Sequence, residues 1–500
     1  MSPTIINDSV REVLTSRVYD VAVKSPLAKA EKLSQKHGLH VYLKREDLQP
    51  VHSFKLRGAY NKMCRLSKAE KQRGVIAASA GNHAQGVALA AQKLGVSALI
   101  VMPRTTPSIK VDAVKSYGAE VLLTGDNYSE AAEECARLTE QTQRVFIHPF
   151  DDPLVIAGQG TIGREILEQL PDVTHIFVPV GGGGLVAGIA HYVKAMRPDV
   201  RVIGVEPVDS AAMGKSLTKG ERVTLKHVGI FADGVAVKQV GEHTFAAAQR
   251  LLDDCVTVTT DQMCAAIKDT FEATRSIVEP SGALGLAGLL AYHLPKNAHA
   301  VALCSGANVS FERLQHIAER TLIGSGKEAL VSVELPERPG AFLEFCDAVV
   351  GKRSITEFSY RFRDHTSAHV LAGISVTDSR DKASLLAHMT KTGFRHVDLS
   401  GDDIAKEHVR HLVGGPRPAE VEQLYHVEFP ERPGALAEFL HTVGSTWNIS
   451  LFHYRSAASD IGRVLIGFQT NDRRALETAL TRTGFAHTRA NSTALTLFCT

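Results

Sequence analysis

Between residues 40 and 205, short β-branched runs alternate with amphipathic helical patterns. This alternation predicts an α/β fold of doubly wound parallel sheets, with helices on both faces of each sheet. Ligands of such sheets bind at the carboxyl ends of the strands, so the segments that follow each strand are the first places to look for a site. The expected strands are residues 40–44, 74–78, 98–102, 120–124, 144–148, 175–180 and 200–205, and the expected helices include 109–117, 129–142 and 161–170.

A glycine run follows one of these strands. Gly181, Gly182, Gly183 and Gly184, and then Leu185, come directly after the strand expected at 175–180 and before a helical pattern. Consecutive glycines let backbone N–H groups converge on an anion, and the helix N-terminus adds a partial positive charge, so the run predicts a phosphate site. It is neither a dinucleotide fingerprint nor a Walker loop, because the spacing differs and no Gly-Lys-Ser/Thr follows. A tight turn that needs a positive φ is the other interpretation.

A second turn lies between the strand expected at 74–78 and an apolar helical pattern. Its backbone N–H groups at Ser79, Ala80 and Gly81 are candidates to hold a substrate carboxylate. Asn82 has an amide that can hydrogen-bond an oxygen on a ligand ring. His83 is a further candidate substrate contact, although a helix-start histidine satisfied by its own backbone is the plainer interpretation.

One lysine stands among small and apolar neighbours. Lys55 lies in the segment 53–59, Ser-Phe-Lys-Leu-Arg-Gly-Ala, at the expected start of a helix. A lysine held against an apolar wall loses its proton more easily than a solvated one and can then form a Schiff base. Lys55 is therefore a candidate nucleophile, and an ordinary surface lysine is the alternative.

Five short motifs in this order resemble those of the serine/threonine dehydratases of the tryptophan-synthase-β-like fold (fold type II), which use pyridoxal 5'-phosphate. The resemblance implies two lobes, the smaller at about 55–155, with the cofactor between them. It also implies that Lys55 forms the Schiff base, that the loop Gly181 to Leu185 holds the phosphate, that Asn82 meets the ring hydroxyl and that Ser305 meets the pyridine nitrogen. The motifs are 53–59, 79–83, 181–185, 279–283 and 305–308.

Over its whole length the chain is similar to the biosynthetic threonine dehydratases (threonine deaminases). The resemblance implies a threonine ammonia-lyase that converts L-threonine, and L-serine as a second candidate substrate, to a 2-oxo acid and ammonia. For threonine the product is 2-oxobutanoate, in the committed step of isoleucine biosynthesis. The sequence does not set the ratio of the two activities. Two other functions remain as alternatives: a β-replacement enzyme of the same fold and a catalytically silent amino-acid sensor.

Two positions distinguish this chain from the related serine racemases. Ala80 stands where those enzymes have a serine that carries a proton, and this favours elimination over racemisation. Glu206 matches one carboxylate of their divalent-metal site, but Ala212 occupies the position of the second, so no metal site is expected. Glu279 should lie near the cofactor ring edge, and its role does not follow from the sequence.

The last third of the chain contains an internal repeat. Residues 334–345 recur as 428–439, and each copy reads as a β-α-β-β-α-β module. We expect three domains: 1–324, 328–400 and 423–500. The two copies resemble ACT-like regulatory domains, which implies isoleucine as an inhibitor and valine as its antagonist; two structural or dimerising modules are the alternative. Candidate effector contacts are the turn residues Pro339, Gly340, Ala341, Pro433, Gly434 and Ala435.

The composition adds limits on partners and location. Of 500 residues 22% are charged and the formal net charge is +2, which gives no electrostatic case for nucleic acid or an anionic membrane. The sequence has no apolar run of membrane-spanning length and no leader pattern, and its seven cysteines are widely spaced without a CxxC pair. We therefore expect a cytoplasmic protein, and the resemblance implies a homotetramer.

Overall fold

The computed structural model divides into two compact units, Met1–Phe311 and Glu312–Thr500, and each is described by itself. Helix α14 (Arg313–Gly324), which the sequence pattern grouped with the first domain, falls in the second unit. The structure describes all residues except 1–2, 312, 337–343, 352, 354, 363–366, 410–420, 431–437, 440–441, 444–445, 456–460 and 494–500.

The smaller lobe of the first unit is a parallel sheet covered on both faces. Its strand order is β5-β4-β3-β6, and every neighbouring pair is parallel. Side chains alternate across β3: Val75 and Ala77 pack toward α3, α5 and α6, and Ile76 and Ala78 pack toward α7. The elements are β3 (Val75–Ala78), β4 (Ala98–Met102), β5 (Glu120–Leu123), β6 (Val145–Phe146), α3 (Lys55–Cys64), α4 (Lys68–Arg73), α5 (Asn82–Leu94), α6 (Ser108–Ser116) and α7 (Tyr128–Thr142).

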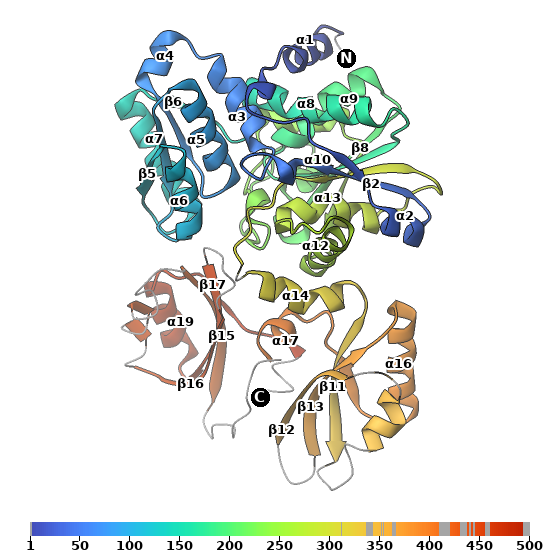
Figure 1. Cartoon of the computed structure of the whole chain (residues 1–500). Helices are drawn as coiled ribbons and strands as arrows, with labels where there is room; N and C mark the ends of the chain where they lie inside the picture. The colour runs from blue at the N-terminus through green and yellow to red at the C-terminus, as the bar shows by residue number, and fades with distance from the viewer. Residues whose placement is uncertain are drawn as a thin grey trace. The chain divides into compact units, whose positions relative to one another are not determined.

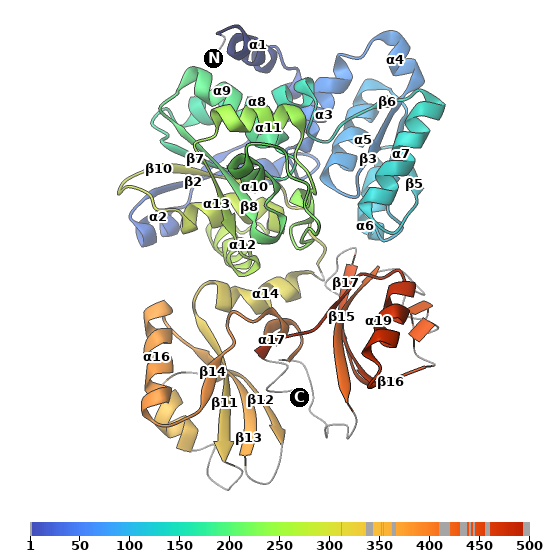
Figure 2. The same ribbon diagram turned by 180° about the vertical axis from the view of Figure 1, so that it is seen from behind.

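The larger lobe lies beside the smaller one in both ribbon views (Figures 1 and 2). Its strand order is β1-β2-β10-β7-β8-β9, and all neighbours are parallel except the antiparallel pair β1 and β2. The strands are β1 (Leu27–Lys29), β2 (His40–Arg45), β7 (His175–Pro179), β8 (Arg201–Pro207), β9 (Asp254–Val258) and β10 (His299–Cys304). The α-helices are α1 (Pro3–Leu14), α2 (Glu31–His37), α8 (Pro153–Gln169), α9 (Gly184–Met196), α10 (Ala212–Lys219), α11 (Glu242–Leu251), α12 (Thr260–Thr274) and α13 (Pro280–Ala291).

The doubly wound parallel architecture is as the sequence predicted, and the carboxyl ends of three strands lead into the candidate site. Strand β3 leads into the turn at Ser79, β7 leads through Val180 into the glycine run, and β10 ends one residue before Ser305. Helix α8 begins eight residues earlier than the expected 161–170. The reason is local, because the Asp152 carboxylate caps the helix by accepting from two of its first N–H groups.

The second unit contains two modules with the same strand arrangement. Their sheet orders are β12-β13-β11-β14 and β16-β17-β15-β18, with antiparallel neighbours throughout, and the two equivalent orders confirm the repeat. The first has β11 (Glu328–Pro336), β12 (Ile355–Phe362), β13 (Ser367–Ser375), α16 (Ser379–Lys391), β14 (His396–Asp398) and α17 (Asp403–Glu407). The second has β15 (Glu422–Pro430), β16 (Asn448–Arg455), β17 (Ile461–Gln469), α19 (Arg473–Arg482) and β18 (His487–Arg489).

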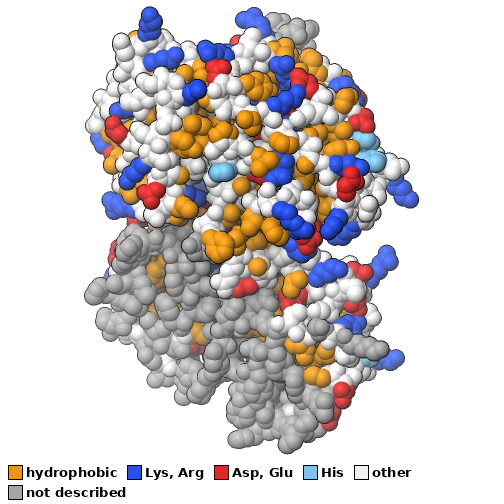
Figure 3. Space-filling view, viewed as in Figure 1, with side chains coloured by type: hydrophobic (Ala, Val, Ile, Leu, Met, Phe, Trp, Pro, Cys, Tyr) orange, Lys and Arg blue, Asp and Glu red, His pale blue; other side chains and the backbone are white. Residues whose placement is uncertain are grey.

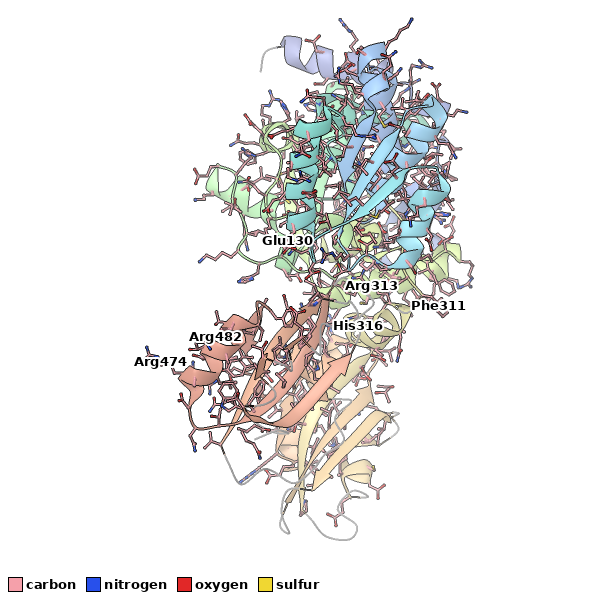
Figure 4. The ribbon with its side chains drawn as sticks, turned by 90° about the vertical axis from the view of Figure 1, so that its left-hand side faces the viewer. Glu130, Phe311, Arg313, His316, Arg474 and Arg482 are labelled. Carbon is pink, nitrogen blue, oxygen red and sulfur yellow. The ribbon has the colours of Figure 1, made fainter. Side chains whose placement is uncertain are left out.

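Helix α19 illustrates how each module covers its sheet. Figure 4 shows Arg474 and Arg482 projecting from this helix, and both are exposed. Leu476 and Leu480 are fully buried and pack against the strands of the same module. The helix is therefore amphipathic, with its apolar stripe against the sheet.

The surface of the first unit carries mixed charge. On the face drawn in Figure 3, basic and acidic side chains are interspersed over the described residues, in keeping with a formal net charge of +2. Among the described residues, no helix has the length and apolar character needed to cross a bilayer.

Candidate active site

Lys55 is the first residue of α3, where the sequence placed it. Its amine donates a hydrogen bond to the Pro149 carbonyl oxygen at 2.9 Å and lies 5.4 Å from the centre of the Phe54 ring. Burial lowers the pKa of the Lys55 amine to about 8, and the Glu279 carboxylate acts in the opposite direction. The neutral fraction of this amine near pH 7 is therefore far larger than that of a solvated lysine, as a nucleophile or general base requires.

A buried ionic cluster fixes the helix that carries Lys55. The Arg57 guanidinium donates to both carboxylate oxygens of Glu46 at 2.8 Å and to Glu165 Oε1 at 2.6 Å. Lys44 Nζ donates to the other Glu165 oxygen at 2.6 Å, and the side chains of these ion pairs are 0% exposed. Burial acts to lower the pKa of Arg57, but the two carboxylates outweigh it and the pKa is raised. Two cations and two anions thus balance in a buried cluster that meets α3 at Arg57, two residues after Lys55.

The glycine run forms a tight loop into α9, and its residues are glycines for two separate reasons. Gly183 has φ +97, a conformation that side chains disfavour. A Cβ at Gly182 would lie 2.3 Å from carbon atoms of the Phe150 ring, and one at Gly184 would lie 2.7 Å from the Phe150 carbonyl oxygen. The turn interpretation therefore accounts for Gly183, and close packing against Phe150 accounts for its two neighbours.

Lys55 and the glycine loop line one cavity. Helix α9 begins at Gly184, so the N–H groups of its first turn belong to the wall. An amine and an anion-binding helix N-terminus facing the same space fit the two reactive ends of pyridoxal phosphate, its aldehyde and its phosphate. The lining residues are Phe54, Lys55, Asn82, Pro149, Phe150, Gln159, Pro179, Gly181, Gly182, Gly183, Gly184, Leu185, Gly234, Val235, Glu279, Ser281 and Ser305.

A hydrogen-bonded group of side chains joins the two lobes at this cavity. Asn82 Nδ2 donates to Glu279 Oε1 at 2.6 Å, and Ser281 Oγ donates to the same oxygen at 2.8 Å. Asn308 Nδ2 donates to Asn82 Oδ1 at 2.6 Å. Burial, followed by the nearby carboxylate of Asp233, raises the pKa of Glu279. Asn82 is therefore held in one orientation from both sides.

The other predicted residues of the second turn are not among those that line the cavity. Ser79, Ala80 and Gly81 are half-buried between β3 and α5, and Ser79 Oγ accepts from the Gly81 N–H at 3.2 Å. His83 is 3% exposed, and its Nε2 lies 2.8 Å from the carbonyl oxygen of Ile147 instead of from its own turn. Burial and then the charge of Lys55 lower the pKa of His83 to about 3, so the ring is neutral.

Ser305 lines the cavity, and its hydroxyl donates to the carbonyl oxygen of Ser281 at 3.2 Å. Glu206, which matches one metal carboxylate of the serine racemases, accepts hydrogen bonds from the N–H groups of Met213 and Gly214, both at 2.7 Å. Burial raises the pKa of Glu206 to about 7. Within the part of the chain that the structure describes, no group of three His, Cys, Asp or Glu residues is placed to hold a metal.

Several wall residues were not predicted from the sequence. Pro149, Phe150, Gln159 and Val235 all line the cavity, and the segment around Pro149 contacts both Lys55 and the glycine loop. Their only sequence signal is that Pro149 and Phe150 directly follow an expected strand. The candidate effector residues Pro339, Gly340, Ala341, Pro433, Gly434 and Ala435 lie outside the described residues.

Two family descriptions match the chain. Residues 18–306 match the family described as "Pyridoxal-phosphate dependent enzyme". Residues 319–409 and 414–496 match the "C-terminal regulatory domain of Threonine dehydratase". The first match covers the unit that contains the cavity, and the second covers both repeat copies.

Two similar proteins match the chain over nearly its whole length, and a solved structure matches about two thirds of it. The biosynthetic L-threonine dehydratase of Haemophilus influenzae is 52% identical over 93% of this chain and 91% of its own length. That of Escherichia coli is 48% identical over 98% of this chain and 96% of its own length. The solved structure of processed threonine deaminase isoform 2 from Solanum lycopersicum is 51% identical, with a TM-score of 0.63, over 64% of this chain and 94% of that one. The chain therefore belongs to the pyridoxal-phosphate-dependent threonine dehydratases that carry a C-terminal regulatory domain.

Proposed function

We infer that the chain is a threonine ammonia-lyase that converts L-threonine to 2-oxobutanoate and ammonia. The observation that carries this inference is that Lys55 and the loop Gly181 to Leu185 line a single cavity. The relatives from Haemophilus influenzae and Escherichia coli, which match this chain over more than nine tenths of both lengths, are biosynthetic threonine dehydratases. When bound, pyridoxal phosphate supplies an aldehyde that captures the substrate amine and a ring that withdraws electrons from Cα.

In this proposal the predicted site residues have separate parts. The Lys55 amine would hold the cofactor by its aldehyde, and as a free amine it would accept the Cα proton of the substrate. The loop N–H groups hold the phosphate, Asn82 holds the ring hydroxyl and Ser305 faces the ring nitrogen. A neutral hydroxyl at Ser305, where a carboxylate could stand, would leave that nitrogen unprotonated and so would make the ring a weaker electron sink. Ser79, Ala80, Gly81 and His83 belong to the substrate side.

Elimination is favoured over racemisation by Ala80. Racemisation needs a second proton carrier on the face of Cα opposite Lys55. A methyl group at position 80 cannot carry a proton, so Lys55 works from one face and the substrate proceeds to elimination. Maize serine racemase, 33% identical with a TM-score of 0.59 over 63% of this chain and 97% of its own, shares the fold. In this proposal the choice between elimination and racemisation on the shared fold therefore depends on the side chain at position 80.

The test is incubation of the purified, cofactor-loaded protein with L-threonine and assay of 2-oxobutanoate. Release of the oxo acid without any added thiol supports the lyase. Turnover that requires a thiol co-substrate supports the β-replacement alternative, and binding of threonine without product supports a silent sensor. Parallel assays with L-serine measure the substrate preference.

We also propose that isoleucine inhibits the enzyme and that valine relieves the inhibition. The regulatory-domain match over residues 319–409 and 414–496 supports an amino-acid effector site in the second unit. The proposed contacts are the two Pro-Gly-Ala turns that begin at Pro339 and Pro433. Deleting residues 325–500 should remove isoleucine inhibition; inhibition that persists would place the effector site in the catalytic part.

We also propose that the protein is a homotetramer and lies in the cytoplasm. The described cysteines are free thiols, which suits a reducing compartment. Light scattering should give a mass four times that of the chain, and a mass of one or two chains would contradict it. Fractionation of the source cells should place the activity with the cytosolic proteins.

A further inference from the structure

The carbonyl group of Gly182 is held from outside the cavity. Its oxygen accepts a hydrogen bond from Thr244 Oγ1 at 2.6 Å and another from the Gly241 N–H at 3.2 Å. Gly182 lines the cavity, whereas neither donor does, and Thr244 is 0% exposed. The Gly182 carbonyl oxygen therefore points away from the space that the cofactor fills.

The direction of this carbonyl fixes the next N–H group. In a planar trans peptide the C=O and the N–H point in opposite directions, and no cis peptide bond occurs in the described chain. The N–H of Gly183 is consequently turned toward the cavity side of the loop. Gly183 packs directly on Thr244, because a Cβ at position 183 would lie 2.8 Å from Thr244 Cβ.

Thr244 is itself held in place by a carboxylate from the cavity wall segment. Asp151 Oδ2 accepts from the Glu242 N–H at 2.8 Å, and its Oδ1 accepts from the Thr244 N–H at 3.2 Å. Asp151 follows Phe150, whose ring packs against the other side of Gly182. The loop peptide is thus enclosed between the Phe150 ring and the first turn of α11.

We propose that Thr244 is a positioning residue for the cofactor phosphate, because its hydroxyl holds the Gly182–Gly183 peptide with the N–H facing the phosphate. A peptide between two glycines rotates at a low cost in energy, since neither residue restricts φ and ψ strongly. A rotated peptide would present the carbonyl oxygen to the phosphate, and two electronegative groups would then repel each other. The Thr244 hydroxyl opposes that rotation.

The test compares two ligands that differ only in the phosphate. Apoprotein is titrated with pyridoxal phosphate and with pyridoxal, and binding is followed by absorbance of the imine. Thr244→Val, which keeps the shape and removes the hydroxyl, should bind pyridoxal phosphate about tenfold more weakly, as the loss of one hydrogen bond near a charge implies. Its affinity for pyridoxal should be unchanged. Thr244→Ser, which keeps the hydroxyl, should stay within about twofold of the wild type for both ligands.

A phosphorus NMR spectrum of the bound cofactor gives an independent readout. Its resonance should shift in Thr244→Val and return to the wild-type position in Thr244→Ser. Equal weakening of both ligands would overturn the proposal, because it would mean that the whole site is disturbed. Unchanged affinity for pyridoxal phosphate would overturn it as well. Should Thr244→Val fail to fold, the same titrations are made with Asp151→Asn. This variant should lose affinity for pyridoxal phosphate, by less than Thr244→Val, and keep its affinity for pyridoxal.

Discussion

The Lys55 amine donates a hydrogen bond to the Pro149 carbonyl oxygen, with 2.9 Å between nitrogen and oxygen. Pro149 precedes Phe150, and the Phe150 ring packs against Gly182 of the glycine loop. A single two-residue segment therefore links the lysine to the loop across the cavity. This link sets the spacing between the groups that we assign to the aldehyde and to the phosphate of the cofactor.

The lowered pKa of Lys55 predicts how the apoprotein captures its cofactor. An amine attacks an aldehyde only when neutral, and the neutral fraction rises as pH increases through the pKa. The rate of imine formation with pyridoxal phosphate should therefore rise with pH around a midpoint of about 8. A midpoint near the ordinary lysine value of about 10.4 would contradict the burial that we describe. Glu279→Gln should move the midpoint to lower pH, because the Glu279 carboxylate raises the pKa of Lys55.

Close packing of the glycine loop predicts a defect from one added methyl group. Gly182→Ala would place a Cβ 2.3 Å from the Phe150 ring, so the ring or the loop must move. We expect the affinity for pyridoxal phosphate to fall by about tenfold or more, since overpacking typically costs about 1–3 kcal/mol. Equilibrium dialysis measures this. Gly401→Ala is the control, because no atom lies within 4 Å of the Cβ it adds; equal affinities in the two variants would contradict the packing.

Loss of Arg57 should destabilise the catalytic unit strongly. Arg57→Met leaves the buried carboxylates of Glu46 and Glu165 without their main cation, and breaking a buried pair in this way costs about 3–5 kcal/mol. Thermal unfolding followed by circular dichroism should show a clearly lower midpoint. Lys219→Met removes an exposed pair with Glu221 and should leave the midpoint nearly unchanged. Equal midpoints for the two variants would show that the cluster is not a structural anchor.

The ion pairs of Glu407 predict that its substitution weakens the response to isoleucine. Its carboxylate accepts from Arg320 Nη1 of α14 at 3.0 Å and from Arg463 Nη1 of β17 at 3.4 Å, so it joins elements of both modules within the second unit. Glu407→Gln should leave threonine turnover without effector unchanged and reduce the inhibition by isoleucine severalfold, within the usual coupling of about 1–3 kcal/mol.

The control for that prediction makes the same chemical change at a glutamate on α14. Glu319→Gln alters a carboxylate that accepts from Gln315 at 3.3 Å, and it should keep the full isoleucine response. If Glu407→Gln also keeps the full response, these ion pairs do not couple the modules.

Much of the fold follows from local pattern, because parallel strands of the smaller lobe are short apolar runs flanked by amphipathic helices. The pattern did not reveal β10 (His299–Cys304), although this strand lies between β2 and β7 in the larger sheet. Its neighbours come from positions far away in the chain, and only tertiary pairing brings them together. The pattern also did not reveal β1 and β9, which lie at the two edges of that sheet.

Site residues could be predicted from the sequence where the residue type itself indicates the chemistry. They could not be predicted where the role depends on which residues lie in contact in the folded chain. Lys55 and the glycine run stand out in the sequence because a lysine among apolar residues and four glycines in a row are unusual. Pro149 acts through its backbone oxygen, and Phe150 through the shape of its ring, so neither has a chemical signature. Thr244 is likewise an ordinary helix residue until its hydroxyl is seen on the Gly182 oxygen.

The central claim is that the Lys55 amine holds the cofactor by its aldehyde while the glycine loop holds its phosphate. Borohydride reduction of the cofactor-loaded protein, followed by proteolysis and mass spectrometry, tests it most directly. We predict one pyridoxyl phosphate group, on the peptide that contains Lys55, and none in Lys55→Ala, which should also lose threonine turnover. A label on another lysine, or a Lys55→Ala variant that keeps both the label and the activity, would contradict the account.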